Sequence, residues 1–497
     1  MALHAQPAAP VPTQAPPVPW RVLGGALILL CGAVSIASFV KGDPSRNDFE
    51  RFADLRLLFL YFGLFGGLCA VYVAAYRQRQ VVPRRALLAT SVACVILLLA
   101  GFPVGSRDVF FYAFYGKIWG FYHANPYVAT IADFPSDPWQ PLVQAQWRDK
   151  PALYGPLALW QSWLIHVASG ATASGAAASG AHLWAAVWLY KAAAAATLAL
   201  TLWVAKAILQ PAARATDGPA AMGLLLLAWN PLFLFECAGN AHNEITMVLF
   251  VLTALWCWRE GYRNTALTVL ALSFWYKWYS LIFVPAFLIA ALQRSGVRAA
   301  IRDALVYTGA TALFGVVLLA PLPGSLLPVF NALLHSGATR GIYPAELSPP
   351  LAALFWSLRA SGLLATDQGL RLFHGARLAL FGGALILIFT RQWRATEPFA
   401  ALSESCCLVA AAFFLLFVTI LPPWHLLLVI ALAIVCGREP FLLAAVVLTV
   451  LAMLSYFLTF AVATLMLCLI VGVLWSMRRL GGRGIAHGSY GKIPGAG

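Results

Sequence analysis

Asp108 is the carboxylate whose neighbours most suggest chemistry. It stands where a long apolar run ends, and Tyr112, Tyr115 and Trp119 follow it at positions i+4, i+7 and i+11, which places all four on one face of a helix. A carboxylate at the head of an aromatic helix suits a sugar site, because it can take a proton from a hydroxyl while the rings stack on the sugar. The alternative is that Asp108 only caps this helix and that the rings form an ordinary interfacial belt.

The elements that position these residues must lie in a membrane. The chain has 497 residues, of which 61% are hydrophobic and only 10% are charged, whereas about 25% of the residues of a soluble protein are charged. Roughly 20 apolar residues span a bilayer core. Apolar runs that we predict as transmembrane helices occupy residues 21–40, 57–76, 86–104, 182–209, 220–238, 304–322, 368–390, 398–421 and 441–476.

This pattern predicts an all-α fold, a polytopic transmembrane helical bundle with about 12–14 crossings and both ends inside. The first run is not followed by a cleavage site, so we expect it to stay as an anchor. Residues 1–20 read as a disordered leader rich in Pro and Ala, residues 21–476 as the transmembrane domain, and residues 477–497 as a cytoplasmic tail.

Interfacial helices are expected in the first long outer loop, residues 105–181. The Trp-rich segment 154–167 is short for a full crossing, and the Ala, Ser and Gly stretch 168–181 reads as a flexible link. The apolar segments on either side of Lys277 are also short, which predicts two short helices that meet at a recessed lysine.

The chain has a net charge of +15, and its basic residues concentrate in alternate loops. This distribution indicates membrane topology and argues against a nucleic-acid partner. The outer loops are then 41–56, 105–153, the turns near 239–244 and 277, 323–367 and 422–425. The arginines assigned to the inside are Arg77, Arg79, Arg84, Arg85, Arg259, Arg263, Arg294, Arg298, Arg302, Arg391, Arg394, Arg478, Arg479 and Arg483.

The nine cysteines form no CxxC motif and show no metal-ligand spacing. We therefore expect neither a zinc site nor a structural disulfide. No cofactor is expected.

An ordered set of short motifs gives the chain a family resemblance between about residues 100 and 290. The motifs are Ser106-Arg107-Asp108 with Tyr112 and Gly116; Asn125-Pro126-Tyr127; Tyr154-Gly155-Pro156-Leu157; Asn230-Pro231 with Glu236, Gly239, His242 and Asn243; and Lys277 before Pro285. With them the sequence resembles the polyprenol-phosphate-sugar-dependent glycosyltransferases of the C-type (GT-C) fold. It is most like the bacterial α-mannosyltransferases that use polyprenol-phosphate mannose.

The resemblance implies a transferase in the bacterial inner membrane that works on the periplasmic face. It would move a sugar, mannose by analogy, from a polyprenol-phosphate donor to a hydroxyl acceptor on a glycolipid or glycan. Asp108 matches the catalytic aspartate, which acts as general base in a single inverting displacement.

Further site residues follow from the same resemblance and from side-chain chemistry. Positive charge near the leaving phosphate stabilises the transition state, and we assign this role to Lys277 and Arg340. The residues expected to bind the sugar or the acceptor are Tyr112, Tyr115, Asn125, Tyr127, Tyr154, His242, Asn243 and His425.

Each of these assignments has a structural alternative. Lys277 can snorkel to the interface, and Arg340 can be a solvated loop charge. Turn chemistry alone accounts for residues such as Asn243, and the lone interfacial His425 can be structural.

A divalent metal is not supported by the sequence. Some relatives carry paired acids where this chain has Asp108-Val109-Phe110, and a carrier with a single phosphate needs less divalent help than a diphosphate donor. The distant Asp133, Asp137 and Asp149 stay open as ligands.

Two other function classes compete with the transferase. A transporter or flippase of a lipid-linked sugar also needs many helices and a polar interior, but transporters often contain an internal repeat, and the two halves of this sequence show none. An accessory membrane scaffold would not require Asp108, Lys277 and His242 to gather on one face.

Overall fold

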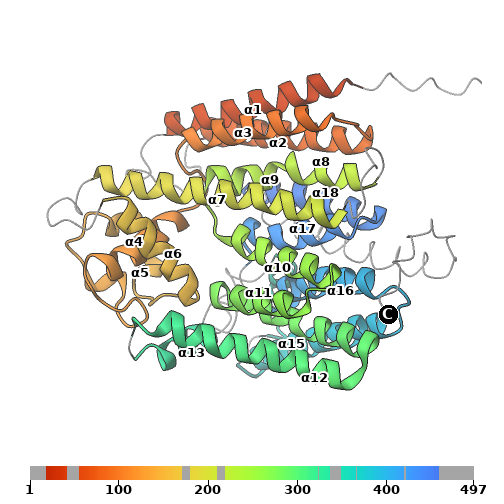
Figure 1. The fold of residues 1–497 in the computed structure, drawn as a ribbon. Helices are drawn as coiled ribbons and strands as arrows, with labels where there is room; N and C mark the ends of the chain where they lie inside the picture. The colour runs from red at the N-terminus through yellow and green to blue at the C-terminus, as the bar shows by residue number, and fades with distance from the viewer. Residues whose placement is uncertain are drawn as a thin grey trace, which may run out of the picture.

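A computed structural model describes residues 18–41, 55–170, 180–209, 219–322, 324–335, 349–364, 367–418 and 421–457, and within these ranges the chain is helical and contains no strand (Figure 1). The longer helices are α1 (Trp20–Lys41), α2 (Leu55–Arg77), α3 (Arg84–Ala100), α7 (Gly180–Leu209), α8 (Pro219–Ala228), α10 (Glu244–Arg259), α11 (Arg263–Tyr276), α12 (Val284–Leu319), α15 (Asp367–Trp393), α16 (Pro398–Ala412), α17 (Leu426–Val435) and α18 (Glu439–Leu454).

Seven helical segments of the described chain are long and apolar enough to cross a membrane, which confirms the predicted all-α membrane bundle. They are residues 20–40, 55–77, 180–209, 220–239, 278–319, 368–393 and 398–417. The outward side chains of these helices are apolar, for example Leu29 and Leu387, as lipid contact requires. The core lies around α17, all ten residues of which are buried.

The predicted inner arginines gather at one end of the bundle. Arg259 at the end of α10 donates to the carbonyls of Ala207 and Ile208 at the end of α7. Arg391 near the end of α15 and Arg438 at the start of α18 both pair with Glu404 on α16. The loops that carry these cations therefore lie on one side, as the charge pattern predicts.

The predicted inner loop near residue 296 is a reversal inside α12. Gly296 has φ 79° and ψ −178°, a conformation that favours glycine. Arg263 at the start of α11 contacts both Ser295 and Asp303, whereas Trp275 near the end of α11 donates to the Thr311 carbonyl. The chain thus reaches the basic end at Gly296 and returns.

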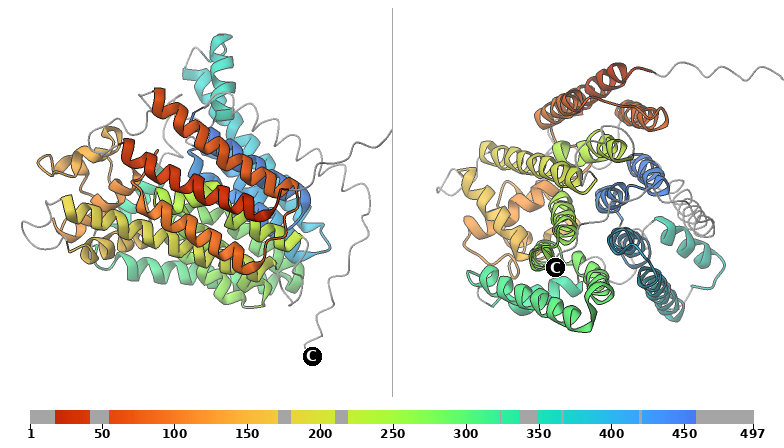
Figure 2. Two further views of the ribbon diagram at one scale, coloured as in Figure 1. Left: turned by 90° about the horizontal axis from the view of Figure 1, so that it is seen from above. Right: turned by 45° about the vertical axis from the view of Figure 1, so that its right-hand side comes forward.

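The opposite end carries an outer lobe, seen on the left of Figure 1. It contains α4 (Asp108–Gly120), η1 (Ile131–Asp133), η2 (Gln140–Leu142), α5 (Ala145–Arg148) and α6 (Pro156–Ala168). These elements and the start of α7 share a second hydrophobic cluster, separate from the main core. In Figure 2 the lobe protrudes from one end of the bundle of long helices.

Close helix contact fixes α4 against α6. A Cβ at Gly116 would lie 2.3 Å from the carbonyl oxygen of Ser162, and one at Gly120 would lie 2.4 Å from the ring of His166. Only glycine allows this approach, and the spacing is the small-xxx-small pattern of close helix pairs.

A buried ion pair joins α4 to the loop that follows η1. Lys117 Nζ lies 2.6 Å from Asp137 Oδ2 and 4.1 Å from the ring centroid of Trp139, and the Tyr122 hydroxyl donates to the same carboxylate at 2.6 Å. Burial lowers the pKa of Lys117, and Asp137 opposes that change.

The short helix 154–167 and the break at Lys277 are confirmed by α6 and by the end of α11. Lys277 is extended (φ −143°, ψ 117°) between α11 and the 3₁₀ helix η5 (Trp278–Phe283). The leader, most of the 168–181 link, the tail and Arg340 lie outside the described residues. The number of crossings stays a prediction, since much of the run 441–476 is also outside them.

Candidate active site

Asp108 is the first residue of α4, at the junction of the lobe and the bundle. The N-cap position is Arg107, whose side chain makes no cap hydrogen bond, so Asp108 is not the N-cap residue of this helix. Its amide donates to Ser106 Oγ at 3.1 Å. Its carboxylate lies 3.5 Å from the Tyr112 hydroxyl and 3.7 Å from His242 Nε2.

The turn that carries His242 follows a local change of helix type. Asn230 accepts from the amides of Leu232 and Phe233 and so begins α9 (Pro231–Phe233), which continues as the π-helix η4 (Leu234–Gly239). Single turns of π-helix occur frequently at functional sites. Here the wider turn presents Glu236 toward the end of the bundle.

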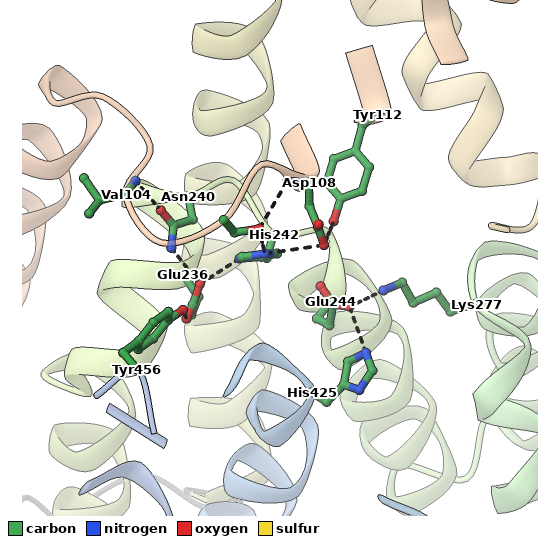
Figure 3. A network of polar contacts seen from close by, with 11 residues as sticks. Val104, Asp108, Tyr112, Glu236, Asn240, His242, Glu244, Lys277, His425 and Tyr456 are labelled. Carbon is green, nitrogen blue, oxygen red and sulfur yellow. Dashed lines mark hydrogen bonds and ion pairs between the residues drawn. The ribbon is translucent and has the colours of Figure 1, made fainter. Parts of the chain in front are cut away.

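Glu236 is completely buried, and three side chains lie against its carboxylate (Figure 3). Asn240 Nδ2 is 2.9 Å from Oε2, His242 Nδ1 is 2.7 Å from the same oxygen, and the Tyr456 hydroxyl binds Oε1. Asn240 in turn accepts from the Val104 amide at 2.8 Å. Glu236 therefore fixes the turn and the segment that leads to Asp108.

His242 bridges Glu236 and Asp108. Its Nε2 lies 3.1 Å from Ser106 Oγ and 3.7 Å from the Asp108 carboxylate, and its ring stacks on Trp424 with centroids 4.0 Å apart. The side chain is fully buried. Both ring nitrogens and one ring face of His242 therefore lie against protein groups, and its contact with the sugar stays a prediction.

Lys277 belongs to a second group of charges beside the first. Its ammonium pairs with Glu244, the first residue of α10, and lies 5.1 Å from the ring centroid of Tyr154. His425 Nε2 is 3.7 Å from the same carboxylate. Since the Lys277 side chain is only 5% exposed, the snorkelling alternative is wrong.

The two groups differ in how much of each acid is exposed. The Asp108 side chain is 22% exposed, whereas those of Glu236 and Glu244 are 0% and 2% exposed. Glu244 Oε2 and Asn243 Oδ1 are buried and make no hydrogen bond within the described part of the chain. Asp108 is therefore the acid of this network that a substrate can reach.

The groups around Asp108 act on the pKa of its carboxyl in opposite directions. Burial raises the pKa of its carboxyl, His242 and Lys277 lower it, Glu244 raises it, and the net direction is upward. A carboxyl with a raised pKa is a stronger base than an ordinary surface aspartate.

Three residues expected at the sugar form hydrogen bonds within the lobe. The Tyr115 hydroxyl donates to the Lys150 carbonyl at 3.3 Å, and the Tyr127 hydroxyl donates to the Tyr154 carbonyl at 2.8 Å. Asn125 accepts from the Tyr127 amide. These bonds hold the segment of Tyr154, whose ring lies 5.3 Å from that of Tyr112, and contact of the three residues with substrate stays a prediction.

The acids left open as metal ligands have protein partners. Asp133 forms a capping box with Thr130, Asp137 pairs with Lys117, and Asp149 pairs with Lys150. Among the described residues, no group of three His, Cys, Asp or Glu side chains could hold a metal ion. Metal independence stays a prediction.

Sequence reasoning gave no role to Glu236, Glu244, Trp424 or Tyr456. The two glutamates carried a usable signal, since an acid next to or within a membrane-depth apolar run is costly and is retained for function. Trp424 and Tyr456 carried none, because nothing local distinguishes them from other interfacial aromatic residues.

Comparison with known families identifies a match over more than half of the chain. The model of the MptA_B family, described as alpha-(1->6)-mannopyranosyltransferase, N-terminal domain, matches residues 20–293. This range includes the outer lobe and the charged network up to Lys277. A comparison with curated proteins returned no match.

Proposed function

Because the chain belongs to the MptA_B family of alpha-(1->6)-mannopyranosyltransferases, we propose that this membrane α-mannosyltransferase takes mannose from a polyprenol-phosphate carrier and uses Asp108 as general base. The observation that carries the proposal is the partly exposed carboxylate of Asp108 at the head of a network whose other acids are buried. The acceptor is a hydroxyl of a glycolipid or glycan.

The reaction is a single displacement. Asp108 takes the proton of the acceptor hydroxyl, the acceptor oxygen bonds to the anomeric carbon, and the bond from that carbon to the carrier phosphate breaks. The electron pair of that bond leaves with the phosphate, which becomes a phosphomonoester. The configuration inverts, so a β-linked donor gives an α-linked product.

Lys277 supports this chemistry as the cation assigned to the leaving phosphate. It is felt electrostatically at Asp108, and the buried pair with Glu244 holds it in place. Positive charge at this point stabilises the developing phosphomonoester more than the ground state. Arg340 is proposed for the same role on the basis of its sequence position alone.

The side of the membrane follows from the charge distribution. The network lies at the end opposite the basic loops, and such loops stay in the cytoplasm. We therefore place the site on the periplasmic face of a bacterial inner membrane.

Asp108→Asn tests the mechanism. Membranes that contain the variant, a mannose-labelled polyprenol phosphate and a mannoside acceptor should lose at least about 100-fold in transfer rate, since general base catalysis contributes 10² or more. Asp133→Asn, an exposed acid of the same loop, should keep the normal rate. Normal transfer by folded Asp108→Asn would refute the assignment of the base.

The donor class is tested in parallel with two labelled substrates, polyprenol-phosphate mannose and a nucleotide-linked mannose. Transfer only from the lipid-linked donor is expected. Transfer only from the nucleotide sugar would refute the carrier, and movement of the lipid across liposomes without transfer would favour a flippase.

A further inference from the structure

Glu236 and His242 have no direct use in the displacement, although they lie immediately behind its base. Asn240, Tyr456 and His242 contact the Glu236 carboxylate, and the side chain is fully buried. A buried carboxylate is costly unless charge or hydrogen bonds compensate it. Its position therefore needs an explanation beyond packing.

The geometry around His242 fixes the direction of its second nitrogen. A carboxylate only accepts hydrogen bonds, so Glu236 requires a proton on Nδ1. The stacked Trp424 ring holds the imidazole plane, and Nε2 is then directed at Ser106 and Asp108. A proton on Nε2 as well makes the ring an imidazolium between two carboxylates.

We propose that Glu236 and His242 form a positioning dyad, in which Glu236 holds His242 as an imidazolium that keeps the Asp108 carboxylate ionised and aimed at the acceptor. The inference rests on the proposed function, because it requires Asp108 to be the base. The dyad itself exchanges no proton in the reaction, since the proton of the acceptor hydroxyl ends on Asp108.

Among the groups near Asp108, we assign the stabilisation of its ionised carboxylate to His242. Lys277 is paired with Glu244, and these two residues act on the pKa of the Asp108 carboxyl in opposite directions. Tyr112, Tyr154 and Tyr456, the remaining titratable groups that face it, are neutral hydroxyls at physiological pH.

The same groups account for the protonation of the histidine. Burial alone lowers the pKa of the His242 imidazole, but the carboxylates of Glu236, Asp108 and Glu244 together raise it above its ordinary value. These carboxylates therefore favour the imidazolium form of His242 over the neutral ring.

The test is the pH dependence of kcat/KM, which reports the ionisation of the free enzyme. His242→Gln removes the positive charge but keeps a polar side chain, so the acidic limb of the profile should move to higher pH by about one to three pH units. Glu236→Gln should move it in the same direction by less. At pH well above the new limb, part of the lost rate should return.

His166→Gln is the matched control. This second buried histidine lies on α6 against Gly120 and Trp139, away from Asp108. Burial, with a contribution from Lys117, lowers the pKa of its ring to about 4, so the ring is neutral and its loss should leave the acidic limb in place.

The outcomes separate this inference from the proposed function. An unmoved limb in folded His242→Gln, with a rate lowered equally at every pH, shows a structural role and overturns the dyad. If that variant does not fold, the limb of Glu236→Gln decides. Transfer by Asp108→Asn would instead refute the base itself, whatever the two profiles show.

Discussion

Gly155 joins the outer lobe to the bundle at a point where no side chain fits. Its amide donates to the Tyr276 carbonyl at 3.1 Å, which holds the lobe against the end of α11 just before Lys277. A Cβ added at Gly155 would lie 2.0 Å from the Trp275 carbonyl oxygen. The backbone itself is ordinary (φ −65°, ψ 159°), so Gly155→Ala acts only through this contact.

The size of the effect follows from the distance. Ordinary van der Waals contact begins at 3.4 Å, so one of the two backbones must move by about 1.4 Å. Tyr154 is on one side of this contact and Lys277 is on the other. A misplacement of about 1 Å costs roughly 100-fold in rate, which is about 2.7 kcal/mol of transition-state stabilisation.

The assay is kcat/KM for mannosyl transfer by Gly155→Ala in detergent or liposomes, with the melting temperature measured on the same sample. We expect a loss of about 100-fold and a lower melting temperature. Gly66→Ala on α2 is the control, since a Cβ there meets nothing within 4 Å and alanine favours the helix. A fully active Gly155→Ala protein would show that the lobe does not position the site.

Two buried ion pairs give further predictions. Lys277→Met leaves Glu244 buried and charged, so the protein should lose about 3–5 kcal/mol of stability. The double variant Lys277→Met with Glu244→Leu should recover most of the melting temperature but not the transfer activity. Lys117→Met should make the outer lobe sensitive to limited proteolysis for the same reason, and added Asp137→Leu should restore resistance. If Lys277→Met or Lys117→Met were as stable as the parent protein, the buried ion pair of that lysine would not stabilise the fold.

Much of the fold was predictable because it depends on local sequence. A bilayer requires about 20 apolar residues per crossing, and basic loops stay on one side, so hydropathy and charge were enough to predict most of the long helices and the common end of Arg259 and Arg391. The shorter helices α10 and α17 were not among the predicted runs. The short segments at Lys277 were predictable for the same reason, since length alone showed that neither spans the membrane comfortably.

The site was predictable only in part. Asp108 stood out because a carboxylate where an apolar run ends is costly, and motif order placed it in a family. Lys277 was assigned to the leaving phosphate, and no signal in the sequence showed that its ammonium pairs with Glu244. Tyr115 was assigned to the sugar from its helix face and Tyr127 from a family motif, and neither signal shows which groups of the lobe these hydroxyls bind.

The sequence by itself determined the membrane bundle, its basic end and the aspartate at the opposite end, since each depends on residues close together in the chain. Only the tertiary structure decided which side chains stand behind that aspartate. Tyr456 lies 220 positions from Glu236, and Ser106 lies 136 positions from His242. Such contacts arise from helix packing, in which hydropathy sets the depth of each residue but not its partner.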